Sequence, residues 1–458
     1  MRETEVLVVG GGVSGLTTSY ELGQRGVDSL VVEKGTRAGG LISTKVRDGF
    51  VMDPGPDAFL TQKPSALALI EELGLTSRIV PTNPHQKKVY VLWKGRLLPL
   101  PAGMRLTVPT RYGPLLTSPL FSLQGKLRLF AERFVARRQP SIVEESIAEF
   151  VERRFGREAL ERVGEPLLAG IHCGDAQKLS MDVLFPRLVE LESRFGSLTK
   201  GMTKVVRTQG DSMFASLDGG MAVLVESLRS RVPADRLVMG ESVERIETSP
   251  EGFVARLSGG GSVGARRVVL ALPISTCRTL TAPTWPAVSK VLSRISTTST
   301  AVVFHAFDSD AFSHPLDGYG FVVPKSEPNR LLAATFVSTK FPGRAPAGST
   351  LLRTFLGGER DPAALALSDD DLIDLSLDEL GKAIGAVPEA RFSSVTRWND
   401  RTPHVELGHK EILAALDEAR PKGLHILGNG LASIGIPDCI AEARKTAAEI
   451  SELVCARG

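Results

Sequence analysis

Three glycines near the start of the chain have the spacing of a turn that binds a dinucleotide. Gly10, Gly12 and Gly15 follow an apolar run at residues 6–9 and precede an amphipathic stretch, which predicts a strand, a tight turn and a helix. A pyrophosphate would lie at the N-terminus of that helix, facing unpaired amides and the positive end of the helix dipole. Glu33 ends the next apolar run, about twenty residues further on, where a carboxylate can bind both hydroxyls of an adenosine ribose. A glycine-rich turn without a ligand is the alternative, but the complete unit favours dinucleotide binding.

A second glycine-rich loop, GNGLASIGIPDCIAEA, begins at residue 428 and leads into another amphipathic stretch. Amides near Gly435 and Ile436 would approach the polar edge of a ring. The dipole of the following helix would stabilise the negative charge that a reduced flavin gathers there. A nicotinamide enzyme must release its dinucleotide, whereas a ligand bound by both ends of the chain is suited to tight retention. The two loops together therefore favour FAD over NAD.

The composition is that of an ordinary globular protein. The chain has 458 residues, enough for two or three domains, with 42% apolar and 23% charged residues. It has no apolar run of about eighteen residues, and Glu3 and Glu5 occupy the place of the basic region of a secretory signal. We therefore expect a cytoplasmic protein. The four cysteines have neither CxxC nor zinc-ligand spacing, so we expect reduced thiols and no metal.

The net charge of +3 is unevenly distributed along the chain. Residues 85–140 contain eleven Lys or Arg against one acid, Glu132. Within them, residues 122–138 predict an amphipathic helix, with Leu123, Leu127, Phe130 and Phe134 on one face and Lys126, Arg133 and Arg137 on another. Such a helix can lie on the inner, anionic face of a membrane, or it can pack against the protein by its apolar stripe. Without stacking aromatics or a nucleic-acid motif, we expect no nucleic acid partner.

The order of the predicted elements indicates an α/β fold. Residues 140–201 are helical in pattern, whereas residues 298–356 alternate apolar and polar side chains as an antiparallel sheet does. We predict a doubly wound, Rossmann-like FAD-binding domain, a mixed-sheet substrate domain and a helical insertion. The predicted segments are 1–80, 205–285 and 395–458 for the FAD-binding domain, 81–204 for the helical insertion and 286–394 for the substrate domain.

Several motifs give nearly the whole chain a resemblance to the FAD-dependent amine oxidase and phytoene desaturase superfamily. They are the G-x-G-x-x-G turn with Glu33, RAGG at residues 37–40, DGGM at residues 218–221 and the terminal LGNGLASIGIPDCI. Within that superfamily, four stretches resemble the oxygen-dependent protoporphyrinogen and coproporphyrinogen oxidases of haem synthesis. These are GPDAFL from residue 55, LLAGIHCGDAQKLSM from residue 167, GYGFVVP from residue 318 and GIPDCI from residue 435.

The resemblance implies a set of FAD-binding residues. Along the adenosine and pyrophosphate it places Gly10, Gly11, Gly12, Val13, Ser14, Gly15, Glu33, Lys34, Arg37, Gly40 and Leu41, with Val243 beside the adenine. Around the flavin it places Gly55, Pro56, Asp57, Ala58, Trp398, Asn429, Ile434, Gly435 and Ile436. Taken alone, Arg37 would be a surface charge and Val243 a core residue of a strand.

The resemblance also implies the reaction, in which hydride leaves a bridging carbon of a porphyrinogen for the flavin, and O2 reoxidises the flavin with release of hydrogen peroxide. No strong side-chain base is required, because the protein mainly holds the carbon over the flavin. The family's carbonyl contact to substrate maps onto Gly170, and apolar walls map onto Tyr319, Val322, Phe341 and Phe355. We expect His172 to be a packed or surface residue rather than a catalytic base.

Two positions depart from the pattern of the porphyrinogen oxidases. A family arginine that would bind a substrate propionate is Lys88 here, which supplies a point charge where arginine could pair a carboxylate bidentately, and Lys87 could replace it. The usual Pro-Gln-Tyr is Pro403-His404-Val405. The resemblance leaves open whether protoporphyrinogen IX or coproporphyrinogen III is the substrate.

Two other flavin enzyme classes are less compatible with the sequence. An amine oxidase would carry an aromatic cage with a tyrosine near the C-terminal flavin loop, but the last tyrosine is Tyr319. A carotenoid desaturase needs a long apolar tunnel, and the basic segment does not support the presence of such a tunnel. The resemblance to the porphyrinogen oxidases implies a porphyrinogen and O2 as partners, and a ferrochelatase-type enzyme that could receive the product. A membrane surface is a further partner if the basic amphipathic helix does not pack against the protein, and the oligomeric state is left open.

Overall fold

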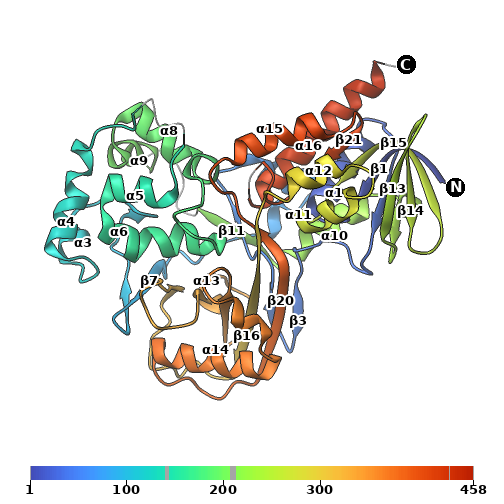
Figure 1. Cartoon of the computed structure of the whole chain (residues 1–458). Coiled ribbons are helices and arrows are strands. Elements are labelled where there is room, and N and C mark those ends of the chain that lie inside the picture. Colours follow the sequence, from blue (N-terminus) through green and yellow to red (C-terminus); the bar gives the residue numbers. More distant parts are fainter. Residues whose placement is uncertain (1, 140–143, 207–212, 433, 457–458) are drawn as a thin grey trace.

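The structure is a computed structural model that describes residues 2–139, 144–206, 213–432 and 434–456. Three lobes are visible: one around the chain termini, one built on a second large sheet, and one made of helices (Figure 1). The predicted α/β class is confirmed. Among the described residues, no helix is both long and apolar enough to cross a membrane.

The lobe at the chain termini is built on a seven-stranded sheet whose strands come from three separate parts of the chain. Its order is β12 (Leu237–Met239), β2 (Ser29–Glu33), β1 (Arg2–Val9), β15 (Ser262–Leu270), β14 (Gly252–Leu257) and β13 (Val243–Ser249), and β21 (Leu424–Ile426) pairs with β15. The strands β12, β2, β1, β15 and β21 are parallel, whereas β13 and β14 are antiparallel to their neighbours.

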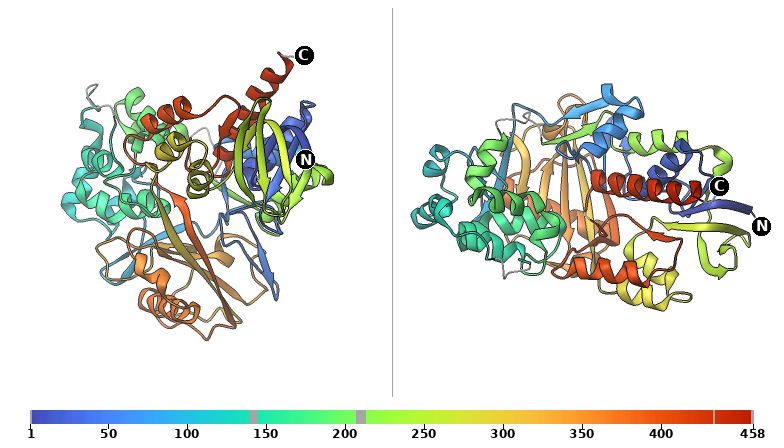
Figure 2. Two further views of the ribbon diagram at one scale, coloured as in Figure 1. Left: turned by 45° about the vertical axis from the view of Figure 1, so that its right-hand side comes forward. Right: turned by 90° about the horizontal axis from the view of Figure 1, so that it is seen from above.

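Helices cover both faces of this sheet, so β1 is buried on both sides. Val6 and Val8 pack with one set of helices, whereas Leu7 and Val9 point to the opposite face. The first set is α1 (Val13–Gln24), α2 (Pro64–Glu72), α10 (Ala222–Arg231) and α16 (Ile436–Cys455); the second is α11 (Ile274–Thr281), α12 (Pro286–Leu292) and α15 (His409–Ala419). From above, α16 lies on one side of the strands and α15 on the other (Figure 2).

The second lobe is a seven-stranded mixed sheet. Its order is β20 (Phe392–Pro403), β16 (Thr297–Phe307), β19 (Thr350–Gly357), β18 (Ala333–Phe336), β17 (Gly318–Val322), β7 (Lys88–Trp93) and β8 (Arg96–Pro99). All pairs are antiparallel except β17 with β7. The helices α13 (Val337–Lys340) and α14 (Asp369–Ile384) belong to this lobe, and the long strands β16 and β20 run from it towards the first lobe (Figure 1).

Three predicted segment boundaries differ from the structure. Residues 286–292 were predicted in the substrate domain, but they form α12, which packs in the core of the first lobe. Residues 88–99 were predicted within the helical insertion, but they form the hairpin β7–β8, whose Lys94-Gly95 turn has positive φ at both residues. Strand β20 runs to Pro403, so residues 395–403 belong to the mixed sheet rather than to the C-terminal FAD-binding segment. Both segments belong to the mixed sheet because each pairs with a strand that is remote in the sequence, β7 with β17 and β20 with β16.

The third lobe contains short helices around its own apolar core. They are α3 (Gly113–Thr117), α4 (Leu123–Phe130), α5 (Ile147–Phe155), α6 (Arg157–Ala159), α7 (Met181–Leu184), α8 (Pro186–Phe195) and α9 (Leu198–Val206), with the 3₁₀ turns η2 (Ala131–Phe134) and η4 (Gly170–His172) and the π-helix η3 (Leu160–Ala169). The predicted helix over residues 122–138 is shorter than expected: α4 ends at Phe130 and continues only as η2.

Short elements complete the chain. Small sheets are formed by β5 (Phe59–Leu60), β11 (Phe214–Leu217) and β6 (Ile79–Pro81), by β9 (Met104–Arg105) with β10 (Val108–Pro109), and by β3 (Lys45–Arg47) with β4 (Phe50–Met52). Further 3₁₀ turns are η1 (Thr76–Arg78), η5 (Ala234–Arg236) and η6 (Pro362–Ala366).

Candidate cofactor and active site

The first glycine turn has the close contacts that only glycine permits. A Cβ at Gly15 would collide with the carbonyl oxygen of Gly10, and Gly10 itself has φ +108°. Gly12 differs from both, because a Cβ there would meet no atom within 4 Å. The turn is therefore tightly packed on the protein side and open beside Gly12, at the N-terminus of α1.

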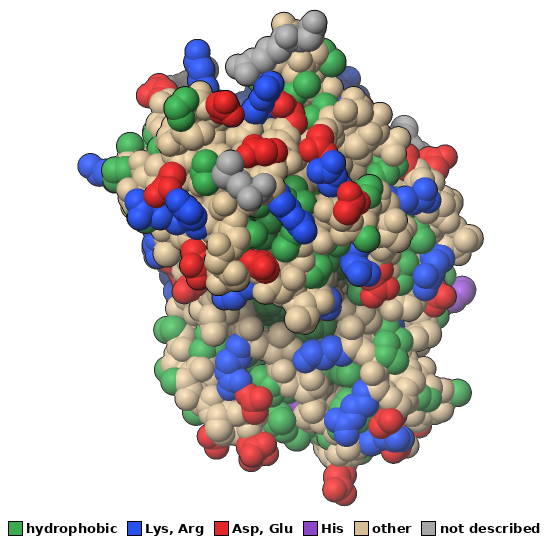
Figure 3. Space-filling view, turned by 90° about the vertical axis from the view of Figure 1, so that its right-hand side faces the viewer, with side chains coloured by type: hydrophobic (Ala, Val, Ile, Leu, Met, Phe, Trp, Pro, Cys, Tyr) green, Lys and Arg blue, Asp and Glu red, His purple; other side chains and the backbone are tan. Residues whose placement is uncertain are grey.

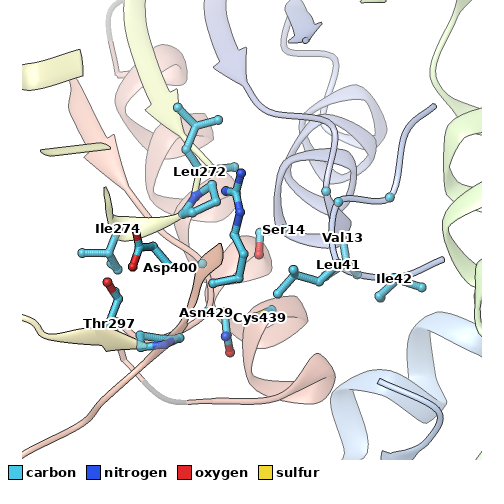
Figure 4. A pocket seen from close by; sticks show the side chains of 18 residues that line it. Val13, Ser14, Leu41, Ile42, Leu272, Ile274, Thr297, Asp400, Asn429 and Cys439 are labelled. Atoms are coloured by element: carbon cyan, nitrogen blue, oxygen red, sulfur yellow. The ribbon is translucent and has the colours of Figure 1, made fainter. Parts of the chain in front are cut away.

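An open pocket lies in front of this turn (Figure 4). Val13, Ser14 and Leu41 lie on one side of it and Ile274, Thr297 and Asp400 on the other, with Asn429 and Cys439 from the C-terminal segment between them. The full lining is Gly12, Val13, Ser14, Gly39, Gly40, Leu41, Ile42, Ala271, Leu272, Pro273, Ile274, Thr297, Asp400, Arg401, Pro403, Gly428, Asn429 and Cys439.

Six of the predicted FAD residues line this pocket: Gly12, Val13, Ser14, Gly40, Leu41 and Asn429. The sequence did not single out the segment after β15, residues 271–274, or the residues contributed by β16 and β20. The signal that could have found the first of these is the ALP that ends the predicted strand. The pocket's helix N-terminus and the space beside Gly12 fit the diphosphate of a dinucleotide.

Glu33 lies at the end of β2, next to the glycine turn, as its spacing predicted. Its carboxylate accepts hydrogen bonds from the amide of Gly11 at 2.6 Å and from the amide of Gly35 at 2.7 Å. Residues 240–241 run beside it, because the amide of Gly240 bonds the carbonyl of Gly35 at 3.1 Å. Val243, predicted beside the adenine, follows two residues later and is half-buried, whereas Lys34 is exposed.

Arg37 has a structural task in the loop after β2. Its guanidinium donates to the carbonyl oxygens of Ala38 and Ile42, both at 2.8 Å, and to that of Gly40 at 2.9 Å. Gly39 continues the loop with φ +114°, and its amide bonds Gly11 at 2.7 Å. The side chain of Arg37 therefore shapes the wall of the pocket by holding three carbonyl groups.

The predicted flavin segment, residues 55–58, is held by side chains from the mixed sheet. Trp398 Nε1 donates to the carbonyl oxygen of Pro54 at 2.9 Å, and the buried Arg353 donates to Pro54 at 3.0 Å and Gly55 at 2.8 Å. The guanidinium of Arg353 also lies 4.4 Å from the ring centroid of Phe355. Trp398 thus bonds the residue that precedes the predicted flavin segment, whereas Phe355 reaches that segment only through Arg353.

The Asp57 carboxylate forms an ion pair with Lys340 at 2.8 Å. Burial by itself would raise the pKa of Asp57, but Lys340 and Arg353 outweigh burial and hold that pKa below its usual value. Tyr319 lies close to this pair. Its hydroxyl donates to Thr82 at 3.0 Å, and the next residue, Asn83, donates its amide to the carbonyl of Lys340 at 2.9 Å. Of the flavin segment, Pro56 and Ala58 are half-buried.

Gly170 lies where an unusual helix ends. Residues Leu160–Ala169 form a π-helix that contains Pro166, and the amide of Gly170 donates to the carbonyl of Glu165, five residues earlier. The carbonyl oxygen of Gly170 accepts a hydrogen bond from the amide of Cys173 at 3.0 Å. Since a carbonyl has a second lone pair, this bond leaves Gly170 able to accept another donor. The nearby His172 is half-buried with its ring edge-to-face on Phe185, and burial lowers its pKa to about 4.

The other predicted substrate residues lie in different surroundings. Val322 is buried and packs with the core of the helical lobe, and Phe341 is fully buried with the ammonium group of Lys340 over its ring. Lys88 is exposed and forms an ion pair with Asp317, which also accepts the hydroxyl of Tyr90. A substrate contact of any of these residues stays a prediction.

The C-terminal loop is fixed to α16. Gly435, with φ +125°, precedes the helix, and Ile436 is buried in the core of the first lobe, while Ile434 is half-buried. Glu442 accepts a hydrogen bond from the amide of Gly428 at 3.1 Å, behind the pocket wall, and burial raises its pKa to about 7.

Comparison with known proteins identifies the family. The profile of the flavin-containing amine oxidoreductases matches residues 13–451. The chain belongs to this family. FAD is its cofactor, and the open space beside Gly12, the amides at the start of α1 and the two glycine-rich loops fit that group.

Relatives within the family match the chain along its length. It is 32% identical over 457 residues to the coproporphyrinogen III oxidase of Bacillus subtilis (strain 168), covering 96% of each chain. It is 28% identical to the chloroplastic protoporphyrinogen oxidase 1 of Spinacia oleracea, covering 98% of this chain and 84% of the relative. A solved structure of a candidate protoporphyrinogen oxidase from Exiguobacterium sp. 255-15 has a TM-score of 0.85, 28% identity and 98% coverage of both chains. Putrescine oxidase, at 16% identity and a TM-score of 0.74, shares the fold.

Proposed function

We propose that the protein is a porphyrinogen oxidase that converts a porphyrinogen to the porphyrin with O2 as the acceptor and hydrogen peroxide as the second product. The observation that carries this proposal is the full-length similarity to coproporphyrinogen III and protoporphyrinogen oxidases. Acceptance of a hydride from a bridging carbon is the chemistry that FAD supplies when bound. The chain's own residues bind and orient.

Orientation of the flavin segment is the task that we assign to Trp398 and Arg353. Both hold the carbonyl of Pro54, so they set the position of residues 55–58 relative to the mixed sheet. The Asp57 carboxylate is neutralised by Lys340, so Asp57 is not an unpaired base. Such a site suits hydride transfer from a carbon held at near-attack distance, for which positioning is the main contribution.

We propose coproporphyrinogen III as the substrate rather than protoporphyrinogen IX. Relatives named coproporphyrinogen III oxidase are 32% identical in Bacillus subtilis and 31% in Propionibacterium freudenreichii, against 28% for the spinach protoporphyrinogen oxidase. The test compares kcat/KM for the two porphyrinogens in air, read as porphyrin fluorescence with peroxide measured in parallel. A higher kcat/KM for protoporphyrinogen IX would reverse the choice, and failure with both would remove the proposed activity. We also propose that the porphyrin product passes to a ferrochelatase-type enzyme.

We also propose that the helical lobe contacts an anionic membrane surface. Three of the four residues of the predicted apolar stripe are exposed, Leu123 by 74%, Leu127 by 61% and Phe134 by 83%, as is Leu116 of α3 by 56%. The fourth, Phe130, packs against the core of the helical lobe. α3 and α4 lie at the outer edge of the molecule (Figure 1). Exposed apolar side chains surrounded by basic ones are suited to a headgroup interface.

The face on the other side of the molecule differs in charge. There, basic and acidic side chains are interspersed over the surface (Figure 3). The membrane test is sedimentation with phosphatidylglycerol vesicles at low salt, comparing the wild type with Leu123→Ser/Leu127→Ser/Phe134→Ser. Val46→Ser, which removes an exposed apolar side chain from β3, is the matched control. Equal sedimentation of wild type and triple variant would remove the proposal.

A further inference from the structure

One wall of the pocket comes from the mixed sheet, and this wall holds the charged side chains that line the pocket. Thr297 starts β16, and Asp400, Arg401 and Pro403 lie at the end of β20, the strand that runs towards the first lobe. Among the residues that line the pocket, only Asp400 and Arg401 have charged side chains. The opposite wall is the N-terminus of α1 with the loop at residues 39–42.

The backbone at this wall is a β-bulge. Thr298 pairs with Thr402 and Thr300 pairs with Trp398, so residues 399–401 together face Ser299 alone. Asp400 has φ +51°, a left-handed conformation that is uncommon outside glycine. Its amide donates to Ser299 Oγ at 2.9 Å, which stabilises the bulge. Bulges near functional sites redirect a side chain, and a strained residue of this kind points to a role beyond packing.

The two arginines near the pocket differ in what they bind. Arg37 donates to three carbonyl groups of its own loop. Arg401 is half-buried and forms no hydrogen bond or ion pair with any residue that the structure describes. An arginine that lines a pocket without a partner is suited to bind an anion, because its planar fork can bond two oxygens of a phosphate. Asp400, by contrast, is exposed to solvent.

We propose that Arg401, aimed by the bulge, binds the diphosphate of FAD and thereby couples cofactor retention to the strand that carries Trp398. The negative charge of the diphosphate then lies between the helix N-terminus at Gly12 and the guanidinium of Arg401. The proposal rests on FAD as the cofactor and is independent of which porphyrinogen is oxidised. A charged hydrogen-bonded pair of this kind predicts about a 10- to 100-fold change in the dissociation constant of FAD.

The experiment measures FAD release from the holoenzyme by flavin fluorescence after dilution, over a range of NaCl concentrations. Arg401→Gln should weaken FAD binding by about 10- to 100-fold and reduce the dependence of binding on salt, because one ionic contact is lost. Arg401→Lys should lie between Arg401→Gln and the wild type. Arg397→Gln is the matched control on the same strand, since Arg397 pairs with Asp369 and does not line the pocket, and it should retain FAD as the wild type does.

Three results would overturn the proposal. Arg401→Gln could retain FAD with the wild-type affinity and salt dependence. Arg401→Gln could also change only the absorption spectrum of the bound flavin, while ADP competes with FAD for binding as it does in the wild type. That result would place the guanidinium at the flavin ring and not at the diphosphate. If Arg401→Gln is insoluble, the test uses Arg401→Lys and the wild type. The proposal would be contradicted if Arg401→Lys has unchanged FAD affinity and salt dependence and if FAD release from the wild type does not depend on salt.

Discussion

Replacement of Gly12 by valine should separate loss of the cofactor from loss of the fold. A Cβ at Gly12 meets no protein atom within 4 Å, and the residue has an ordinary φ of −74° at the N-cap of α1. We therefore expect the apoprotein to lose no more than about 1 kcal/mol of stability, the usual cost of an unfavourable N-cap residue. The valine side chain would instead occupy the space that the diphosphate needs.

The loss of FAD affinity follows from the amides at the start of α1. If the diphosphate is kept from two of them, the cost is about 1.5–3 kcal/mol for each charged hydrogen bond, or roughly a hundredfold to ten-thousandfold in affinity. Gly15→Ala is the contrasting variant: its Cβ would collide with the carbonyl of Gly10, so the apoprotein itself should be destabilised. The assay is FAD content after gel filtration, with urea unfolding of the apoproteins. A folded Gly12→Val protein with full FAD occupancy would refute the assignment of this turn.

Three further predictions use other parts of the site. Lys88→Ala should raise KM by no more than about fivefold with kcat unchanged, because an exposed lysine already paired with Asp317 contributes under about 1 kcal/mol to binding; a large fall in kcat in steady-state assays would contradict this. Trp398→Phe, which removes the bond to Pro54, should lower kcat more than it raises KM, and equal kcat values would show that the bond does not position the flavin segment. Glu442 has a folded-state pKa of about 7, above its usual value, so its own contribution to stability should fall by about 2 kcal/mol between pH 5 and 8; the difference in unfolding free energy between the wild type and Glu442→Gln, measured in urea, should change by that amount, and a difference that is constant with pH would contradict it.

Local sequence patterns predicted the parts of the site that are local in the chain. The glycine turn, the helix after it and the position of Glu33 depend on a single strand–helix–strand unit, so spacing alone was informative. The same holds for the C-terminal loop, where Gly435 precedes α16.

Other features depend on contacts between remote segments, which periodicity does not contain. The hairpin at residues 88–99 joins a sheet whose other strands begin more than 190 residues later in the chain, so its membership could not be deduced locally. The spacing of Leu123, Leu127, Phe130 and Phe134 predicted a stripe, but not that Phe130 packs against the helical core while the other three face solvent. Arg401 was missed because its place in the pocket arises from a bulge, and bulges leave little trace in a sequence.

Anaerobic mixing of the purified, FAD-loaded protein with coproporphyrinogen III tests the central claim most directly. Hydride transfer to FAD predicts that the flavin absorbance near 450 nm bleaches anaerobically. Because one FAD accepts only two electrons and the porphyrin requires successive two-electron oxidations, porphyrin fluorescence should rise when O2 is admitted, as the absorbance is restored and peroxide forms. Persistence of the oxidised flavin spectrum with both coproporphyrinogen III and protoporphyrinogen IX, in a protein whose flavin can still be reduced by dithionite, would contradict the account.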